Sequence, residues 1–168
     1  MQLKKIDKDL YRQRLNRVML LSILALVVIS LASSTLLIAL FADGAGSNFW
    51  LNFSGVVIGC VVVGFTLKHF KQHPFFYEIA YIWDLKHELN LIQRKLSAIE
   101  AAVADNDADA ILILLFSYQA SLLVWQLDDN TLMQSELAIA QNALQQKIAA
   151  AGLTVDVNTY RRELLSRF

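Results

Sequence analysis

Two uncharged apolar runs, separated by only seven residues, constrain this chain more than any other feature. Residues 18–41 and 49–67 contain no Asp, Glu, Lys, Arg or His. As α-helices they would be about 36 Å and about 28 Å long, and the hydrocarbon core of a bilayer is roughly 30 Å thick. Because lipid cannot hydrogen-bond a bare backbone, both runs are predicted to be membrane-spanning helices. The link at 42–48 is so short that the helices must be antiparallel, and we predict a transmembrane hairpin over residues 18–67.

The basic residues predict the orientation of this hairpin. They gather before the first run and after the second, whereas the link holds Asp43 and no base. The positive-inside rule then places both termini in the cytoplasm and, in a bacterium, makes the chain a multi-pass protein of the inner (plasma) membrane. The same side chains are candidate contacts for anionic lipid headgroups. They are Lys4, Lys5, Lys8, Arg12, Arg14, Arg17, Lys68 and Lys71.

Residues 1–17 form a basic amphipathic segment. It either lies on the inner membrane surface or continues directly into the first span, and the sequence leaves both open. A signal peptide is a poor interpretation of the first run, because the apolar core is too long and a second apolar run follows at once.

Small residues recur at helical spacing in both spans. Gly55 and Gly59 share one face of the second span, with Gly64 further along, and Ser30 and Ser34 are spaced alike in the first. Such residues let two helices approach closely. The close approach is either within the hairpin, which we favour, or between two chains.

Residues 75–168 are predicted to form a cytoplasmic helical domain. Apolar residues alternate three and four apart from Ile82 to Val103, which predicts one helix over 77–105 with an apolar seam. The seam packs either within the chain or against a second copy, and the pattern does not choose. Its candidate association residues are Leu85, Leu89, Ile92, Leu96 and Ile99.

Residues 110–127 are an ambiguous helix, since 18 uncharged residues are near the lower limit for a third span. Gln119, Gln126 and the acidic flanks favour the buried centre of a bundle instead. Thr131 with Gln134, or Asn130, can cap the next helix, and Gly152 predicts its end. The predicted fold class is an all-α membrane protein. In it, the transmembrane hairpin precedes an antiparallel bundle of three long helices plus a short C-terminal helix at 159–168.

Signatures of catalysis and metal binding are weak. The sequence has no Gly-rich phosphate loop, GxSxG, HExxH or cysteine pair. His69 and His73 have metal-ligand spacing, but the following proline moves His73 out of helical geometry. The acidic run 105–109 begins like a calcium loop but lacks its glycine and its final glutamate, so we interpret it as a turn with a helix N-cap. The neighbours His87 and Glu88 point to different helix faces, and we expect both on the surface.

Six short stretches carry a family resemblance. They are Ile6-Asp7-Lys8, Tyr11-Arg12, Leu15-Asn16-Arg17-Val18, Trp83-Asp84-Leu85-Lys86, Arg94-Lys95-Leu96 and Leu127-Asp128-Asp129-Asn130-Thr131-Leu132. Through them nearly the whole chain resembles an uncharacterised family of gammaproteobacterial two-span membrane proteins, known as a domain of unknown function. The resemblance implies an inner-membrane location in a Gram-negative bacterium and implies nothing about chemistry.

We therefore expect a self-associating, membrane-anchored interaction or scaffold protein without catalytic activity. One alternative is a membrane-coupled regulator or sensor that relays a change in the bilayer to the cytoplasmic helices. A second is an oligomeric pore or transport accessory subunit, which the uncharged spans disfavour. The expected partners are membrane lipids and another copy or another membrane protein, with no cofactor, metal, nucleic acid or small-molecule substrate.

Overall fold

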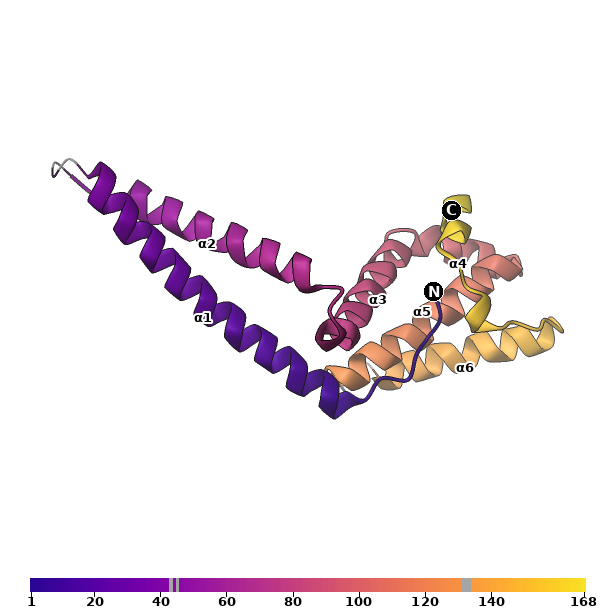
Figure 1. Cartoon of the computed structure of the whole chain (residues 1–168). Helices are drawn as coiled ribbons and strands as arrows, with labels where there is room; N and C mark the ends of the chain where they lie inside the picture. The colour runs from indigo at the N-terminus through magenta and orange to yellow at the C-terminus, as the bar shows by residue number, and fades with distance from the viewer. Residues whose placement is uncertain (43, 45, 131–133) are drawn as a thin grey trace. The chain divides into compact units, whose positions relative to one another are not determined.

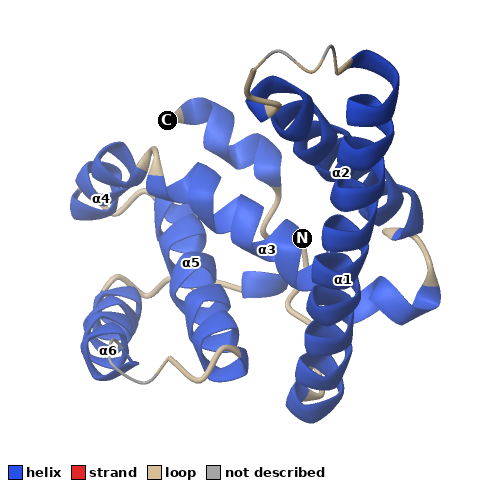
Figure 2. Cartoon of the chain, turned by 90° about the vertical axis from the view of Figure 1, so that its left-hand side faces the viewer, coloured by secondary structure: helices blue, strands red, loops and turns tan. Residues whose placement is uncertain are grey.

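The described residues are mostly helical and contain no strand, and Figure 2 shows the loops that connect the helices. The computed structural model describes residues 1–42, 44, 46–130 and 134–168. Two positions of the predicted link, 43 and 45, and the predicted capping residue Thr131 therefore lie outside the described residues. The elements in chain order (Figure 1) are α1 Lys8–Phe41, α2 Phe49–Phe70, η1 Pro74–Phe76, α3 Tyr77–Gln93, α4 Leu96–Ala104, α5 Ala108–Leu127, α6 Gln134–Ala150, η2 Val157–Thr159 and η3 Arg162–Arg167.

The chain divides into two compact units. Asp9–Ala80 forms the hairpin unit, which contains α1, α2 and η1. Met1–Lys8 together with Tyr81–Phe168 forms the helical unit, so this unit draws on residues from both ends of the sequence. Two helices, α1 and α3, run across the division without a break.

In the hairpin unit, α1 and α2 lie antiparallel and expose most of their apolar side chains. Leu21, Val28 and Phe65 are 64%, 64% and 72% exposed. Of the basic residues before position 18, those from Lys8 onward belong to the same helix, because α1 begins at Lys8, whereas Lys4 and Lys5 precede it. Among the residues that the structure describes, three helices, α1, α2 and α5, are long and apolar enough to cross a membrane. The predicted apolar helices are thus present, and they are compatible with a membrane protein.

In the helical unit, α5 is the central element. Every residue from 110 to 116 is buried, and α4, α6, η2 and η3 all contact this helix. The ring of Phe116 on α5 stacks on Tyr160, with ring centroids 3.9 Å apart and planes 10° apart. A helix that is apolar on all sides is stable in water when other elements cover every face, as they do here for its first two turns.

The prediction of a single helix over 77–105 is wrong in one respect, because the structure divides this stretch into α3 and α4. Lys95, with φ −114° and ψ 7°, leaves helical geometry, and its backbone N–H donates to Ile92 O at 2.9 Å. Its ammonium group donates to Leu165 O at 2.6 Å. This contact with the C-terminal segment holds the turn, and nothing in the local sequence predicts it, because Arg and Lys are good helix formers.

The ends of two helices follow the sequence prediction. Asp107 is the N-cap of α5, and its Oδ1 accepts a hydrogen bond from Ala110 N at 2.9 Å. After α6, Gly152 adopts φ 64°, the left-handed conformation that ends many helices, while Leu153 N donates back to Ile148 O at 3.1 Å. The predicted short C-terminal helix is present as the 3-10 helix η3, and the hydrogen bond from Lys95 to Leu165 O holds it against the turn before α4.

Candidate functional site

The most buried charged side chain of the described residues is Glu88, on α3, which is only 1% exposed. Its Oε1 accepts a hydrogen bond from the hydroxyl of Tyr160 at 2.7 Å. Its Oε2 accepts one from Nε of Arg162 at 2.8 Å and a second from Nη2 of the same guanidinium. Both carboxylate oxygens are therefore engaged, and α3 is bonded to the segment that joins η2 to η3.

Protonation in this cluster follows from burial and hydrogen bonding. Burial raises the pKa of Glu88, but the hydrogen bonds and charge of Arg162 and the hydroxyl of Tyr160 outweigh it, so this pKa is lowered overall. Burial, and then the hydrogen bond to the carboxylate, raises the pKa of Tyr160. The cluster is thus an ionised carboxylate held by a neutral phenol and a cationic guanidinium.

The sequence prediction for this pair was wrong about Glu88. His87 is exposed as expected, but Glu88 is buried. The signal was present in the spacing: Glu88 comes three residues after Leu85 and four before Ile92, so it lies on the face of the apolar seam. The partners on the C-terminal segment are 72 and 74 residues away, and no local pattern identifies them.

A polar cavity of about 500 Å³ opens beside this cluster, lined by Met1, Glu88, Arg161, Arg162 and Glu163. The Met1 ammonium donates to Tyr160 O at 2.8 Å. The buried carboxylate on its wall, Glu88, has both oxygens hydrogen-bonded. The arrangement favours a structural role that joins distant segments.

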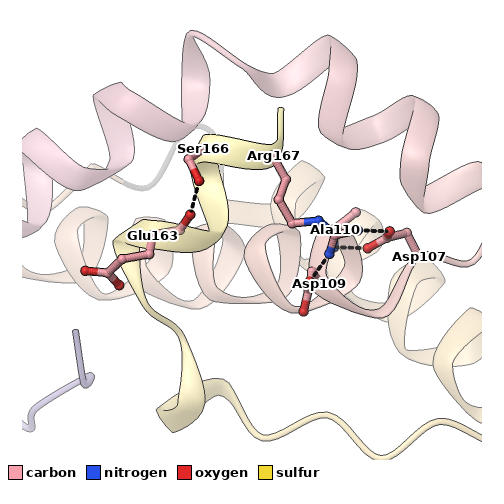
Figure 3. Close-up of polar contacts among 6 residues, drawn as sticks. All are labelled: Asp107, Asp109, Ala110, Glu163, Ser166 and Arg167. Atoms are coloured by element: carbon pink, nitrogen blue, oxygen red, sulfur yellow. Dashed lines mark hydrogen bonds and ion pairs between the residues drawn. The ribbon is translucent and has the colours of Figure 1, made fainter.

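A second polar cluster joins the start of α5 to η3 (Figure 3). Arg167 donates to Oδ2 of Asp107 at 3.1 Å and also pairs with Asp109. Ser166 Oγ donates to Glu163 O at 2.6 Å within η3. The acidic run thus serves as a helix cap and as an anchor for the C-terminal segment. Among the described residues, no group of three or more His, Cys, Asp and Glu side chains is placed to hold a metal ion.

The small residues of the two apolar helices meet within the hairpin unit. Gly55 lies against Ser34 and Gly59 lies against Ser30, so closely that an added Cβ at either glycine would overlap the serine hydroxyl. The hydroxyl of Ser34 also donates to Asn52 O at 3.3 Å. Gly64, by contrast, has no atom within 4 Å of an added Cβ. Of the two arrangements considered, the close approach seen is the one within a single chain.

The seam residues also find their partners within the chain. Leu85, Ile92 and Ile99 are completely buried, while Leu89 and Leu96 are half-buried. The helical unit therefore covers the seam without a second copy.

The basic residues near the apolar helices have several different environments. Arg14 pairs with Glu78 and donates to Pro74 O at 3.2 Å, so it fixes η1. Lys8 pairs with Asp129 in the helical unit. Lys4 N donates to the hydroxyl of Tyr81 at 2.9 Å. The side chains of Lys5, Arg12, Arg17 and Lys68 are exposed, and Lys71 is half-buried.

The two candidate metal ligands near position 70 are in non-equivalent places. His69 lies in the last turn of α2, but His73 is extended, with φ −70° and ψ 140°. Nδ1 of His73 accepts a hydrogen bond from Phe75 N at 3.2 Å, so this residue caps η1. The prediction that Pro74 takes His73 out of helical geometry is confirmed.

Comparison with known proteins gives a family and no function. A family model described as a protein of unknown function (DUF3087) matches residues 1–165. The resemblance to an uncharacterised family is thereby confirmed. No curated protein and no solved structure matches the chain.

Proposed function

The chain belongs to DUF3087, a family of unknown function, and from that premise we propose that it is a membrane-anchored interaction or scaffold protein. In this proposal α1 and α2 form a transmembrane hairpin in a bacterial inner membrane, with both termini in the cytoplasm. The helical unit is the cytoplasmic part, and it acts by contact with a second copy or with another membrane protein rather than by catalysis.

The observation that carries the proposal is the difference in burial between apolar helices. In α1 and α2 only 11% of the most apolar 18-residue window is buried, against 50% in α5. Exposed side chains such as Trp50 and Val61, at 72% and 64%, are stable in lipid and costly in water. The hairpin unit therefore has the surface of an anchor, and the helical unit has a core of its own.

The acidic ends of α5 support its placement outside the membrane. Asp109 pairs with Arg167 at one end, and Asp128 pairs with Lys86 at 2.6 Å at the other. A third span would also move the basic C-terminal segment to the outside, against the positive-inside rule. We therefore propose two spans.

Self-association is tested with the purified full chain in vesicles, where no other protein is present. Chemical cross-linking should trap a dimer whose yield rises with the protein-to-lipid ratio. A photo-cross-linking residue at Ile139, which is 70% exposed on α6, should identify the face involved, with Gln145 as an exposed control elsewhere on the same helix. A monomer at every ratio would contradict the self-associating form of the proposal.

Topology is tested by cysteine labelling after Cys60→Ala. Cysteines placed at Ser47, Lys5, Asp105 and Asn130 should react with an impermeant reagent from the outside only at Ser47. Asp105 and Asn130 flank α5, so labelling of these two positions from opposite sides would make α5 a third span and overturn the two-span arrangement.

A membrane-coupled regulator is the second candidate, and one observation favours it. The segment before α1 is bonded to the helical unit, where Tyr81 OH receives a hydrogen bond from Lys4 N and donates one to Gln2 O at 3.1 Å. The chain then enters α1 at Lys8 and returns through α3, so both crossings between the units fall within helices. Any tilt of the hairpin could act on the helical unit through both crossings.

This candidate predicts a response to bilayer thickness. In a Trp50→Phe chain, the remaining tryptophans, Trp83 and Trp125, both report on the helical unit. Their fluorescence should change between vesicles of short-chain and long-chain lipid, and Tyr81→Phe should reduce the change. Identical spectra in both lipids would exclude coupling.

A further inference from the structure

The hairpin unit contains an apolar cavity between α1 and α2 that neither the proposed scaffold nor the proposed regulator uses. Its volume is about 400 Å³, or about 930 Å³ with its open side included. Leu21, Ala25 and Ile29 of α1 line one wall, Val63 and Leu67 of α2 line the other, and Phe76 of η1 lies at the end.

The cavity exists because the two helices approach closely at only one end. Ser30 and Ser34 contact Gly59 and Gly55 there, whereas Gly64 has no neighbour within 4 Å of an added Cβ. Figure 1 shows α1 and α2 separating as they run away from the link between them. The hydrogen bonds from Arg14 to Pro74 O and Phe75 O then hold η1 across the wide end.

The depth of the cavity corresponds to one leaflet. From Val18 to Ile29, both of which line it, the helical rise gives about 16 Å, close to half of a hydrocarbon core of roughly 30 Å. Arg17 and Lys68 immediately flank lining residues at the wide end. The cavity therefore lies in the leaflet on the side of these cations.

The size of the cavity separates the two occupants that a membrane could supply. A helix of 10 Å diameter has a volume on the order of 1,300 Å³ over a length of about 16 Å. Even the larger measure of the cavity, about 930 Å³, is too small for a helix from a second copy. A single acyl chain is narrow, apolar and as long as one leaflet is deep, so it fits the walls.

The wide end is complementary to a phosphate group. Arg17 and Lys68 are exposed cations at this end, and His73 lines the opening. Because Nδ1 of His73 accepts the hydrogen bond from Phe75 N, the neutral ring carries its proton on Nε2 as a donor. The wide end therefore offers a lipid headgroup one lining donor, His73, and two exposed cations that adjoin the lining residues Val18 and Leu67 in the sequence.

We propose that this cavity binds one acyl chain of an anionic phospholipid, with Arg17, Lys68 and His73 holding the headgroup phosphate. The site lies inside the hairpin unit, so it differs from the ring of ordinary lipid around the outer faces of α1 and α2. The inference rests on the proposed membrane anchoring.

The test uses the full chain in phosphatidylcholine vesicles with a trace of phosphatidylglycerol that carries a photoreactive group on its acyl chain. Mapped adducts should concentrate on the cavity wall, at the half-buried Ala25, Ile29 and Val63, several-fold above the exposed Leu24 and Val61, which do not line it. Even labelling around both helices, or cross-links to a second copy in the cavity, would overturn the proposal.

Two matched pairs of variants sharpen the result. Ala25→Phe fills the cavity and should reduce adducts there several-fold, whereas Ala32→Phe, on an exposed part of α1, should not. Arg17→Gln with Lys68→Gln should remove the preference for the anionic over the zwitterionic lipid, whereas Arg94→Gln, at an exposed cation of the helical unit, should keep it. A preference unchanged by the double substitution would overturn the headgroup assignment.

Flotation of the same vesicles separates the two proposals. A chain that fails to float with the vesicles contradicts membrane anchoring itself. A chain that floats but labels evenly leaves the anchor in place and removes only the lipid site.

Discussion

The second and fifth helices have nearly the same length and both are apolar enough to cross a membrane, yet their surroundings differ completely. Most side chains of α2 are exposed, and its only buried residues are Gly55 and Gly59, which face α1. Those of α5 are covered by α4, α6 and the C-terminal segment. Composition alone therefore does not separate an anchor from a core helix. The difference lies in whether the rest of the chain supplies apolar partners.

The largest expected effect comes from a charge in the centre of α5. Ile113 is completely buried, so Ile113→Asp leaves a carboxylate without a partner and should cost about 5 kcal/mol or more. That is enough to unfold a domain of ordinary stability. Limited trypsin digestion should show rapid cleavage of the helical unit, with the membrane association of the hairpin retained.

Ile139→Asp is the matched control, because this isoleucine is 70% exposed on α6 and the substitution should be tolerated. Equal protease resistance of Ile113→Asp and Ile139→Asp would mean that burial of α5 does not stabilise the helical unit.

The next effect concerns the one covered face of α2. At Gly55 even a Cβ would lie 2.7 Å from Ser34 N, so Gly55→Leu forces α1 and α2 apart. Overpacking of this kind costs about 1–3 kcal/mol or more. Thermal unfolding of the full chain in mild detergent should begin several degrees earlier.

Gly64→Leu adds the same side chain to the same helix where the structure has open space, and it should leave the melting temperature unchanged. A similar loss in both variants would mean that contact with α1 does not set the result, because Leu has a higher helix propensity than Gly and propensity alone would not lower stability.

A smaller effect is expected at the polar contact of the helical unit. Tyr160→Phe keeps the ring stacked on Phe116 but removes the hydroxyl that donates to Glu88. A buried acceptor that loses its donor costs about 1–3 kcal/mol. Urea unfolding of the full chain in detergent measures this loss, and Tyr118→Phe, on a half-buried tyrosine of α5, is the control. If Tyr160→Phe loses no more stability in urea than Tyr118→Phe, Tyr160 stabilises the unit by ring packing alone.

The smallest effect is a pH dependence. The pKa of Glu88 is lowered in the folded state from an ordinary value of 4.5, so its ionised form stabilises the fold above that pH. This contribution is lost as the pH falls through the lowered folded-state value. The stability of Glu88→Gln should therefore depend less on pH below about 4.5 than that of the natural chain. If the stability of Glu88→Gln and of the natural chain falls equally with pH, ionisation of Glu88 does not contribute to the acid dependence.

The sequence predicts the helices well where a pattern is local. The apolar runs locate α1, α2 and α5, Asp107 is the predicted kind of cap, and Gly152 ends α6 where expected. It fails where a distant contact decides. Lys95 leaves helical geometry beside Leu165, 70 residues away, and Glu88 is buried because Tyr160 and Arg162 satisfy it. Neither contact has a signature in the neighbouring residues.

The helical unit is assembled from both ends of the chain, and this has a consequence during synthesis. Residues 1–8 are made before the hairpin, but Tyr81 and Asp129, to which they bond, are made after it. Residues 1–8 must therefore wait while the apolar hairpin emerges, and the unit closes only after Asp129 has been made. A fragment that starts at Tyr81 would lack residues 1–8 and their contacts with Tyr81 and Asp129. Biochemical work on the helical unit therefore calls for a chain in which residues 1–8 are joined to it.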